Sequence, residues 1–167
     1  MLAWVMSDFL GDTTMSTERL LLPIDSSRRS AGVVNYVIRR RDMGHGVEAC
    51  LLHVEQPLGD WGLLRNMTRG NDAARRQVEQ VLSQVAHPLV KHDIPYAAYL
   101  RSGSIVFSIL DAAEELDCQQ IVVPLPPSGL WRFLSGAVVS TLYARQRNIP
   151  VVAVDGNGLP VRSAMRT

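Results

Sequence analysis

Five short apolar segments alternate with longer segments of helical periodicity in this chain, and that alternation restricts the possible folds more than any other feature. The apolar segments are the predicted strands: Arg19–Ile24, Val47–Val54, Pro95–Leu100, Gln120–Val123 and Pro150–Val154. Strands and helices that alternate with short connections form parallel sheets, with right-handed crossovers that place helices on both faces. The sequence therefore predicts an α/β fold built on a five-stranded parallel sheet.

The predicted helices carry apolar residues at three- and four-residue spacing. Asp25, Ser26 and Ser27 offer N-caps to the first helix. A later helical segment includes Pro88, which removes one backbone hydrogen bond and clashes with the carbonyl of Gln84. We expect that helix to kink or break at Pro88.

The length of 167 residues is enough for one domain with a substantial core. We expect residues 1–17 to be a flexible extension, with Met1 or Met15 as the start, residues 18–155 to form the domain, and residues 156–167 to be a tail. A net charge of +1 gives no reason to expect nucleic acid as a partner, and no apolar run is long enough to cross a membrane. The expected location is the cytoplasm.

Two cysteines and four histidines occur, without the spacing of a metal site. Cys50 and Cys118 are isolated in apolar surroundings, and we interpret them as buried thiols of a reducing compartment rather than as a disulfide or metal pair. His53 ends a predicted strand and is interpreted as a hydrogen-bonded strand-end histidine. No nucleophile elbow is present either, so we expect neither a metal nor catalytic residues.

The segment IVVPLPPSGLWRFLSGA at Ile121–Ala137 has the strand–loop–helix outline of a phosphate-binding loop. Such loops normally contain glycine, which leaves every N–H group free for phosphate. Here Pro124, Pro126 and Pro127 occupy the loop, and proline has no N–H group to donate. We interpret the loop as a phosphate site that has been disabled or given another use.

Three segments together resemble the universal stress protein family. They are RLLLPIDSSRRSAGVVNYV from Arg19, LLHV at Leu51–Val54, and DCQQIVVPLPPSGLWRFLSGAVVSTLYARQRNIPVVAV from Asp117, and the resemblance spans residues 19–154. It implies a Rossmann-like, adenine-nucleotide-binding fold with an open five-stranded parallel sheet in the order 3-2-1-4-5, and a dimer joined through the last strands. Some members bind ATP through the pattern G-x-x-G-x9-G-[ST]. On this chain the pattern falls on Val123, Pro126, Gly136 and Ala137, so only Gly136 is retained.

The resemblance also implies where a nucleotide would lie. Asp25 matches an aspartate at the adenine and ribose end, and Gly136 and Ala137 would face phosphate. The other expected contacts are Pro23, Val54, Gly129 and Val138. Two alternatives remain open: Asp25 is only a helix N-terminal carboxylate, and Gly136 only allows close packing of the helix on the sheet.

Three functions follow from these observations. The first is a non-enzymatic stress-response or regulatory protein that binds ATP or another adenine nucleotide weakly, or not at all. The second is an ATP-binding member that uses a modified loop and the N–H groups of Gly136 and Ala137. The third, a slow ATP hydrolase, lacks an evident general base. Charge-assisted hydrogen bonds contribute roughly 1.5–3 kcal/mol each, so the loss of two would weaken ATP binding by about 3–6 kcal/mol.

The last predicted strand is an uncovered sheet edge, which invites pairing with another chain. We expect a homodimer in which residues Val151, Val152, Ala153 and Val154 pair with the same residues of a second copy, while the tail leaves without covering them. Proline at Val152 is expected to give a monomer. The apolar residues of Trp61–Met67 are a candidate lid or surface for an unknown protein partner, or they pack on the sheet.

Overall fold

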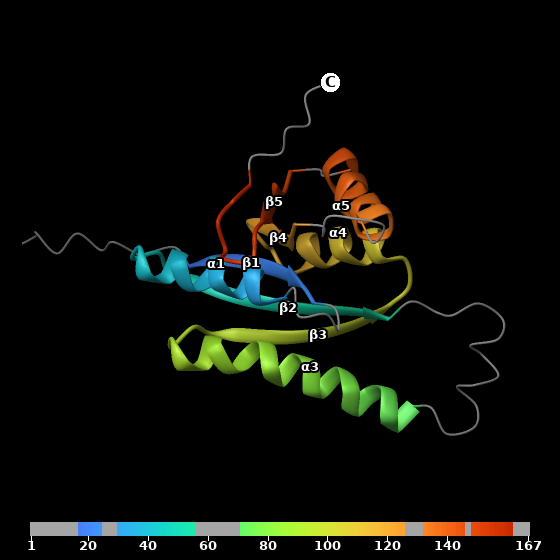
Figure 1. Cartoon of the computed structure of the whole chain (residues 1–167), viewed down its shortest axis with the longest axis horizontal. Helices are drawn as coiled ribbons and strands as arrows, with labels where there is room; N and C mark the ends of the chain where they lie inside the picture. Colours follow the sequence, from blue (N-terminus) through green and yellow to red (C-terminus); the bar gives the residue numbers. More distant parts are fainter. Residues whose placement is uncertain (1–16, 25–29, 56–70, 126–131, 146–147, 162–167) are drawn as a thin grey trace, which may run out of the picture.

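The structure is a computed structural model that describes residues 17–24, 30–55, 71–125, 132–145 and 148–161 (Figure 1). Its strands form one parallel sheet in the order β3-β2-β1-β4-β5, as predicted. The strands are β1 (Glu18–Pro23), β2 (Val47–Glu55), β3 (Tyr96–Ser102), β4 (Gln120–Pro124) and β5 (Val151–Val154). The helices are α1 (Ser30–Asp42), α3 (Asn71–Lys91), α4 (Ile105–Glu115) and α5 (Arg132–Arg145).

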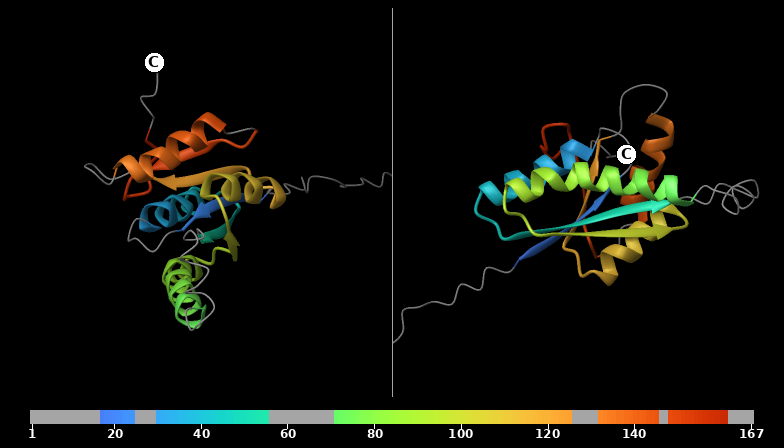
Figure 2. Two further views of the ribbon diagram at one scale, coloured as in Figure 1. Left: turned by 90° about the vertical axis from the view of Figure 1, so that its right-hand side faces the viewer. Right: turned by 90° about the horizontal axis from the view of Figure 1, so that it is seen from below.

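Two hydrophobic cores lie on the two faces of the sheet. Leu20 and Leu22 of β1 pack with α1 and α3, whereas Leu21 packs on the other face with α4 and α5. Side chains alternate between the faces of a strand, so burial of all three leucines requires helices on both sides. Figure 2 shows α1 and α3 on one side of the sheet and α4 and α5 on the other.

Of the expected kink or break at Pro88, the break does not occur, because helix α3 continues past Pro88 to Lys91. The reason is position: Pro88 lies in the last turn, where only a few residues follow it. The carbonyl of Pro88 still accepts a hydrogen bond from the N–H of His92 at the helix end.

A turn at residues 155–161 folds back after β5 and packs on α1. The Asn35 side-chain amide donates to the carbonyl of Gly156 at 3.1 Å, and the N–H of Val161 donates to the carbonyl of Ala153 at 2.8 Å. Gly158 is buried with a φ of 74°, and a Cβ atom there would lie 2.4 Å from the backbone nitrogen of Tyr36. Glycine is therefore required at Gly158, both for its backbone conformation and for the close approach to α1. We call residues 155–161 the β5 turn.

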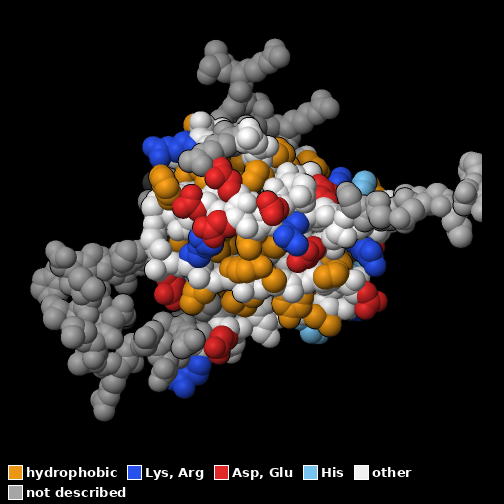
Figure 3. All heavy atoms as spheres, turned by 180° about the vertical axis from the view of Figure 1, so that it is seen from behind, with side chains coloured by type: hydrophobic (Ala, Val, Ile, Leu, Met, Phe, Trp, Pro, Cys, Tyr) orange, Lys and Arg blue, Asp and Glu red, His pale blue; other side chains and the backbone are white. Residues whose placement is uncertain are grey.

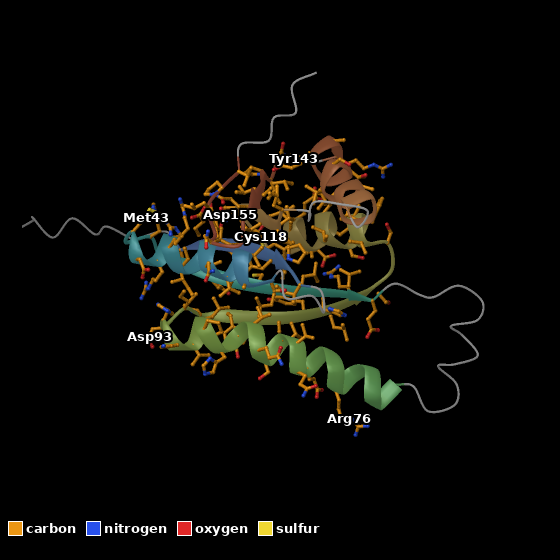
Figure 4. All side chains as sticks on the ribbon, viewed as in Figure 1. Met43, Arg76, Asp93, Cys118, Tyr143 and Asp155 are labelled. Carbon is orange, nitrogen blue, oxygen red and sulfur yellow. The ribbon has the colours of Figure 1, made fainter. Side chains whose placement is uncertain are left out.

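The β5 turn covers part of the outer edge of β5, which corrects the expectation that the tail leaves this edge uncovered. Ala153 turns both of its backbone groups outward, and both have partners within the chain. Its carbonyl accepts from Val161, and its N–H donates to the Tyr143 hydroxyl of α5 at 3.2 Å. Tyr143 and Asp155, the first residue of the turn, are labelled in Figure 4.

The backbone groups of Val152 face the opposite way to those of Ala153, towards β4. The carbonyls of Pro150 and Val154 both accept hydrogen bonds from β4 and the residue that follows it. Successive residues turn their backbone groups to opposite sides of a strand, so Val152 also bonds towards β4. Proline at Val152 would therefore break the pairing of β4 with β5, and it is not a selective test of the outer edge.

At the amino ends of β1 and β4, polar side chains join the two strands to α1. The Tyr36 hydroxyl donates to Gln120 Oε1 at 2.9 Å, and Gln120 Nε2 donates to Glu18 Oε1 at 2.8 Å. Arg40 forms an ion pair with the other oxygen of Glu18. Burial raises the pKa of Tyr36 above the ordinary value of 10.0. This network closes the sheet end opposite to the predicted binding site.

Candidate functional site

The carboxyl ends of β1 and β4 form the switch point of the sheet, because the strand order runs outward in both directions from this pair. Ligands of open α/β sheets bind in the crevice at such a point. The register of β1 with β4 covers only Leu20 with Gln120 and Leu21 with Ile121. Beyond these pairs, towards Pro23 and Pro124, no pairing between the described residues of the two strands continues.

Two prolines face this opening. The N–H of Ile24 donates to the Leu52 carbonyl of β2, so the preceding residue, Pro23, turns its nitrogen towards β4. The N–H of Leu125 donates to the Val154 carbonyl of β5, so Pro124 turns its nitrogen towards β1. Proline costs no ladder hydrogen bond at these positions, which explains how each fits into a central strand. The same geometry leaves the opening without two N–H groups, which residues other than proline would supply at these positions.

The end of β2 meets the end of β1 through His53. Its Nδ1 lies 3.0 Å from the carbonyl oxygen of Ile24 and donates to it, which leaves Nε2 as the acceptor nitrogen. The sequence-based interpretation of His53 as a hydrogen-bonded strand-end histidine is confirmed. The next residue, Val54, is half-buried and packs on the α4–α5 side of the sheet. Pro23 and Val54 thus lie at the ends of neighbouring strands, whereas Asp25 lies outside the described residues.

Helix α5 carries the residues that were predicted to face phosphate. Ala137 is exposed, and Val138 is half-buried against the core of the α4–α5 face. Gly136 and Ala137 are the fifth and sixth residues of α5, and only the first four N–H groups of an α-helix lack a partner within the helix. Their N–H groups are therefore used by the helix. Gly129 lies outside the described residues.

The nucleotide pattern places its first glycine on Val123, which the structure finds inside β4. Val123 is 3% exposed and packs in the core on the α4–α5 face. A buried strand residue cannot approach phosphate as a loop glycine does. Pro124 is the first residue of this segment whose backbone faces the opening, and the sequence pattern did not single it out from the other loop prolines.

A hollow of about 700 Å³ lies away from this opening, beside the turn from β3 to α4. It is lined by Leu100, Arg101, Ser102, Gly103, Ser104, Phe107, Ser108 and Asp111. Arg101 is already paired with Glu115 of α4, which lowers the pKa of that carboxyl. The rear of the molecule shows a band of hydrophobic side chains crossed by charged ones (Figure 3). The hollow lies at the edge strand, so it does not belong to the switch point.

Within the described part of the chain, no group of three or more His, Cys, Asp or Glu side chains could hold a metal ion. Among the same residues, no helix combines the length and apolar character needed to cross a membrane. The predicted caps Ser26 and Ser27 and the Trp61–Met67 patch lie outside the described residues.

Comparisons with known proteins agree on one family. The model of the universal stress protein family matches residues 16–155. A universal stress protein from Archaeoglobus fulgidus, solved with dAMP, is 21% identical with a TM-score of 0.61, over 82% of this chain and 97% of that chain. The protein UspA from Lactobacillus plantarum is 15% identical with a TM-score of 0.66, over 82% and 97%. An Arabidopsis thaliana family member, solved with AMP, is 12% identical with a TM-score of 0.57, over 83% and 91%. At these identities the structural likeness is one of fold, and no curated protein matches.

Proposed function

Because this chain belongs to the universal stress protein family, we propose that it is a non-enzymatic stress-response protein that binds adenine nucleotide weakly. The nucleotide would lie at the opening between the carboxyl ends of β1 and β4. Solved relatives were crystallised with dAMP, cAMP and AMP, which favours an adenine nucleotide as the ligand class. Pro23, Asp25 and Val54 are the residues proposed at the adenosine end.

The orientation of Pro124 is the observation that supports weak binding of the nucleotide. Its nitrogen turns towards the opening and has no hydrogen to donate to phosphate. The N–H groups of Gly136 and Ala137 are occupied within α5, which argues against the alternative of a modified loop that binds ATP tightly. Few donors therefore remain among the described residues for the β- and γ-phosphates.

Titration calorimetry tests this proposal with ATP and magnesium, with AMP, and with CTP as a base-specificity control. Two missing charge-assisted hydrogen bonds weaken ATP by about two to four decades, which moves a micromolar site to roughly the high micromolar to millimolar range. We expect the dissociation constants of ATP and AMP to lie within about tenfold of each other, because the β- and γ-phosphates would form few hydrogen bonds with the protein. A low-micromolar dissociation constant for ATP would contradict the proposal.

A single substitution isolates the missing donor. Pro124→Ala restores one N–H group that faces the opening and leaves the buried Val123 in place. We expect it to tighten ATP binding about 10-fold or more, as one charge-assisted hydrogen bond would. The matched control is Pro95→Ala, which adds an N–H group at the amino end of β3, far from the opening. Equal affinity of the Pro124→Ala variant and the native protein would show that the shape of the loop is limiting.

We also propose a homodimer through β5, with residues Val151–Val154 at the contact. The position of β5 at one end of the strand order supports it. Because the β5 turn occupies the carbonyl of Ala153, this dimer requires the turn to leave the edge or to join the contact. Light scattering distinguishes the two states: a native protein that stays monomeric at tens of micromolar would rule the dimer out.

A further inference from the structure

The outer edge of β3 is the sheet edge that the described part of the chain leaves open. β3 pairs with β2 from Tyr96 to Ser102 and runs along the margin of the sheet (Figure 2). At the other edge, the β5 turn and Tyr143 already occupy both outward backbone groups of Ala153. Proteins normally protect an open edge with a lysine, a proline, a bulge or a cover. β3 contains neither lysine nor proline, and its register with β2 has no bulge.

The hydrogen bonds with β2 fix which backbone groups of β3 face outward. The N–H of Ala49 donates to the carbonyl of Pro95 at 2.9 Å, and the N–H of Gly103 donates to the carbonyl of Glu55 at 3.0 Å. Successive residues of a strand turn their backbone groups to opposite sides, so the odd-numbered residues of β3 bond to β2. The even-numbered residues turn their N–H and C=O groups outward, where no described residue bonds to them: Tyr96, Ala98, Leu100 and Ser102.

The side chains of these residues form an exposed apolar surface. Tyr96 and Leu100 are 43% and 49% exposed, and Ala98 between them is exposed as well. All three share the face of α1 and α3, because Ala98 is in register with Leu51, which packs in the core on that side. The one charged side chain of β3, Arg101, lies on the opposite face and is already paired within the chain. The exposed apolar surface therefore carries no charge of β3.

We propose that β3 pairs antiparallel with β3 of a second copy, about a two-fold axis at Ala98. This axis places Ala98 opposite Ala98 of the second copy, and Tyr96 opposite its Leu100. Each pair exchanges both N–H···O bonds, so the outward groups of the two copies satisfy one another. The register matches the two large apolar side chains and puts a small side chain at the axis. A slip of two residues would leave Tyr96 opposite Ser102 or Ala98 instead.

This contact is separate from the homodimer proposed through β5, because β3 and β5 are opposite edges of the sheet. It requires no movement of the β5 turn. It also leaves the opening between β1 and β4 free, since these two strands lie in the interior of the sheet. If both edges pair, each copy contacts two others and the assembly is larger than a dimer. Variants confined to β3 therefore separate the two contacts.

Disulfide trapping of full-length Ala98→Cys tests the register. Cα atoms of a hydrogen-bonded antiparallel pair lie about 5.5 Å apart, within the range that a disulfide bridges. We expect mild oxidation to give a covalent dimer that dithiothreitol returns to monomer. The native Cys50 and Cys118 are 0% and 4% exposed and should not react.

The matched control is Ser102→Cys. Residue 102 has the same outward backbone direction, but its two copies would lie roughly 26 Å apart along the paired strands. This control should therefore give no covalent dimer. Equal yields from Ser102→Cys and Ala98→Cys, or no covalent dimer from Ala98→Cys, would overturn the proposal.

Light scattering at tens of micromolar gives an independent measurement. Ala98→Pro removes an outward N–H group and no hydrogen bond to β2, so the sheet should stay intact, as circular dichroism would verify. Its mass should fall below that of the native protein, to a monomer if β3 is the only contact and to a dimer if β5 also pairs. Leu100→Lys should have the same effect with the backbone unaltered, because an edge lysine opposes pairing.

Ala98→Ser is the control for this measurement and should keep the native mass. A native protein that is monomeric at this concentration would overturn the proposal. So would a native mass in folded Leu100→Lys, whether or not Ala98→Pro folds. If the native mass persists in that variant and Ala98→Cys gives no covalent dimer, the association belongs to β5 and not to β3.

Discussion

Replacing Gly32 with alanine should destabilise the protein, although alanine is the better helix former. Gly32 lies in the first turn of α1, beneath the β5 turn. A Cβ atom there would lie 2.3 Å from the carbonyl oxygen of Asp155 and 3.3 Å from the Cα of Gly156. Both are backbone atoms, so the contact can be relieved only by moving the turn away from α1.

The two opposing effects have different sizes. Alanine in place of glycine stabilises a helix by at most about 1 kcal/mol. Overpacking of this kind costs about 1–3 kcal/mol. A displaced turn also weakens the hydrogen bonds of Asn35 with Gly156 and of Val161 with Ala153, at about 0.5–1.5 kcal/mol each. We therefore expect a net loss of about 1–3 kcal/mol, which lowers the Tm by roughly 3–10 °C.

Chemical denaturation and thermal melting measure this loss, and Gly156→Ala is the matched control. Gly156 lies in the same turn, and a Cβ atom there would have nothing within 4 Å. The control should change the free energy of unfolding by less than about 0.5 kcal/mol. Faster hydrogen exchange at the amide of Val161 in the Gly32→Ala variant would place the disturbance at the turn. If Gly32→Ala raises the Tm and leaves that amide protected, the packing of the turn on α1 is refuted.

Two further outcomes are expected. Burial raises the pKa of Tyr36, so the folded state holds the phenol proton more strongly than the unfolded state does, and the free energy of unfolding should fall as the pH rises above 10.0, by up to about 1.4 kcal/mol per pH unit. Tyr36→Phe should reduce this slope in denaturation measured between neutral and alkaline pH. An unchanged slope would contradict the assignment. His53→Leu removes the donor to the carbonyl of Ile24 and should lower the free energy of unfolding, measured by chemical denaturation, by about 0.5–1.5 kcal/mol. The control His45→Leu, at an exposed turn, should lower it little. Equal losses in the two variants would show that the hydrogen bond of His53 contributes nothing to stability.

The strands, their parallel arrangement and the end of the sheet proposed to carry the site followed from the sequence by itself. Each apolar segment indicates its own burial, because consecutive leucines such as Leu20–Leu22 are all buried only when helices pack on both faces of the sheet. The order of the strands followed from the family resemblance, and the position of the opening followed from that order. These properties depend on neighbours along the chain or on the family as a whole.

Only the tertiary structure decided which distant atoms meet. The placement of Cys50 and Cys118 in one hydrophobic core, the return of the β5 turn onto Gly32, and the direction in which the backbone of Pro124 and Val152 faces all depend on register and docking. A shift of one residue in the register of a strand would reverse the direction of every backbone group in that strand, and no local sequence pattern determines the register. Register is set by the whole sheet at once, because each strand must satisfy its hydrogen bonds and both hydrophobic cores together.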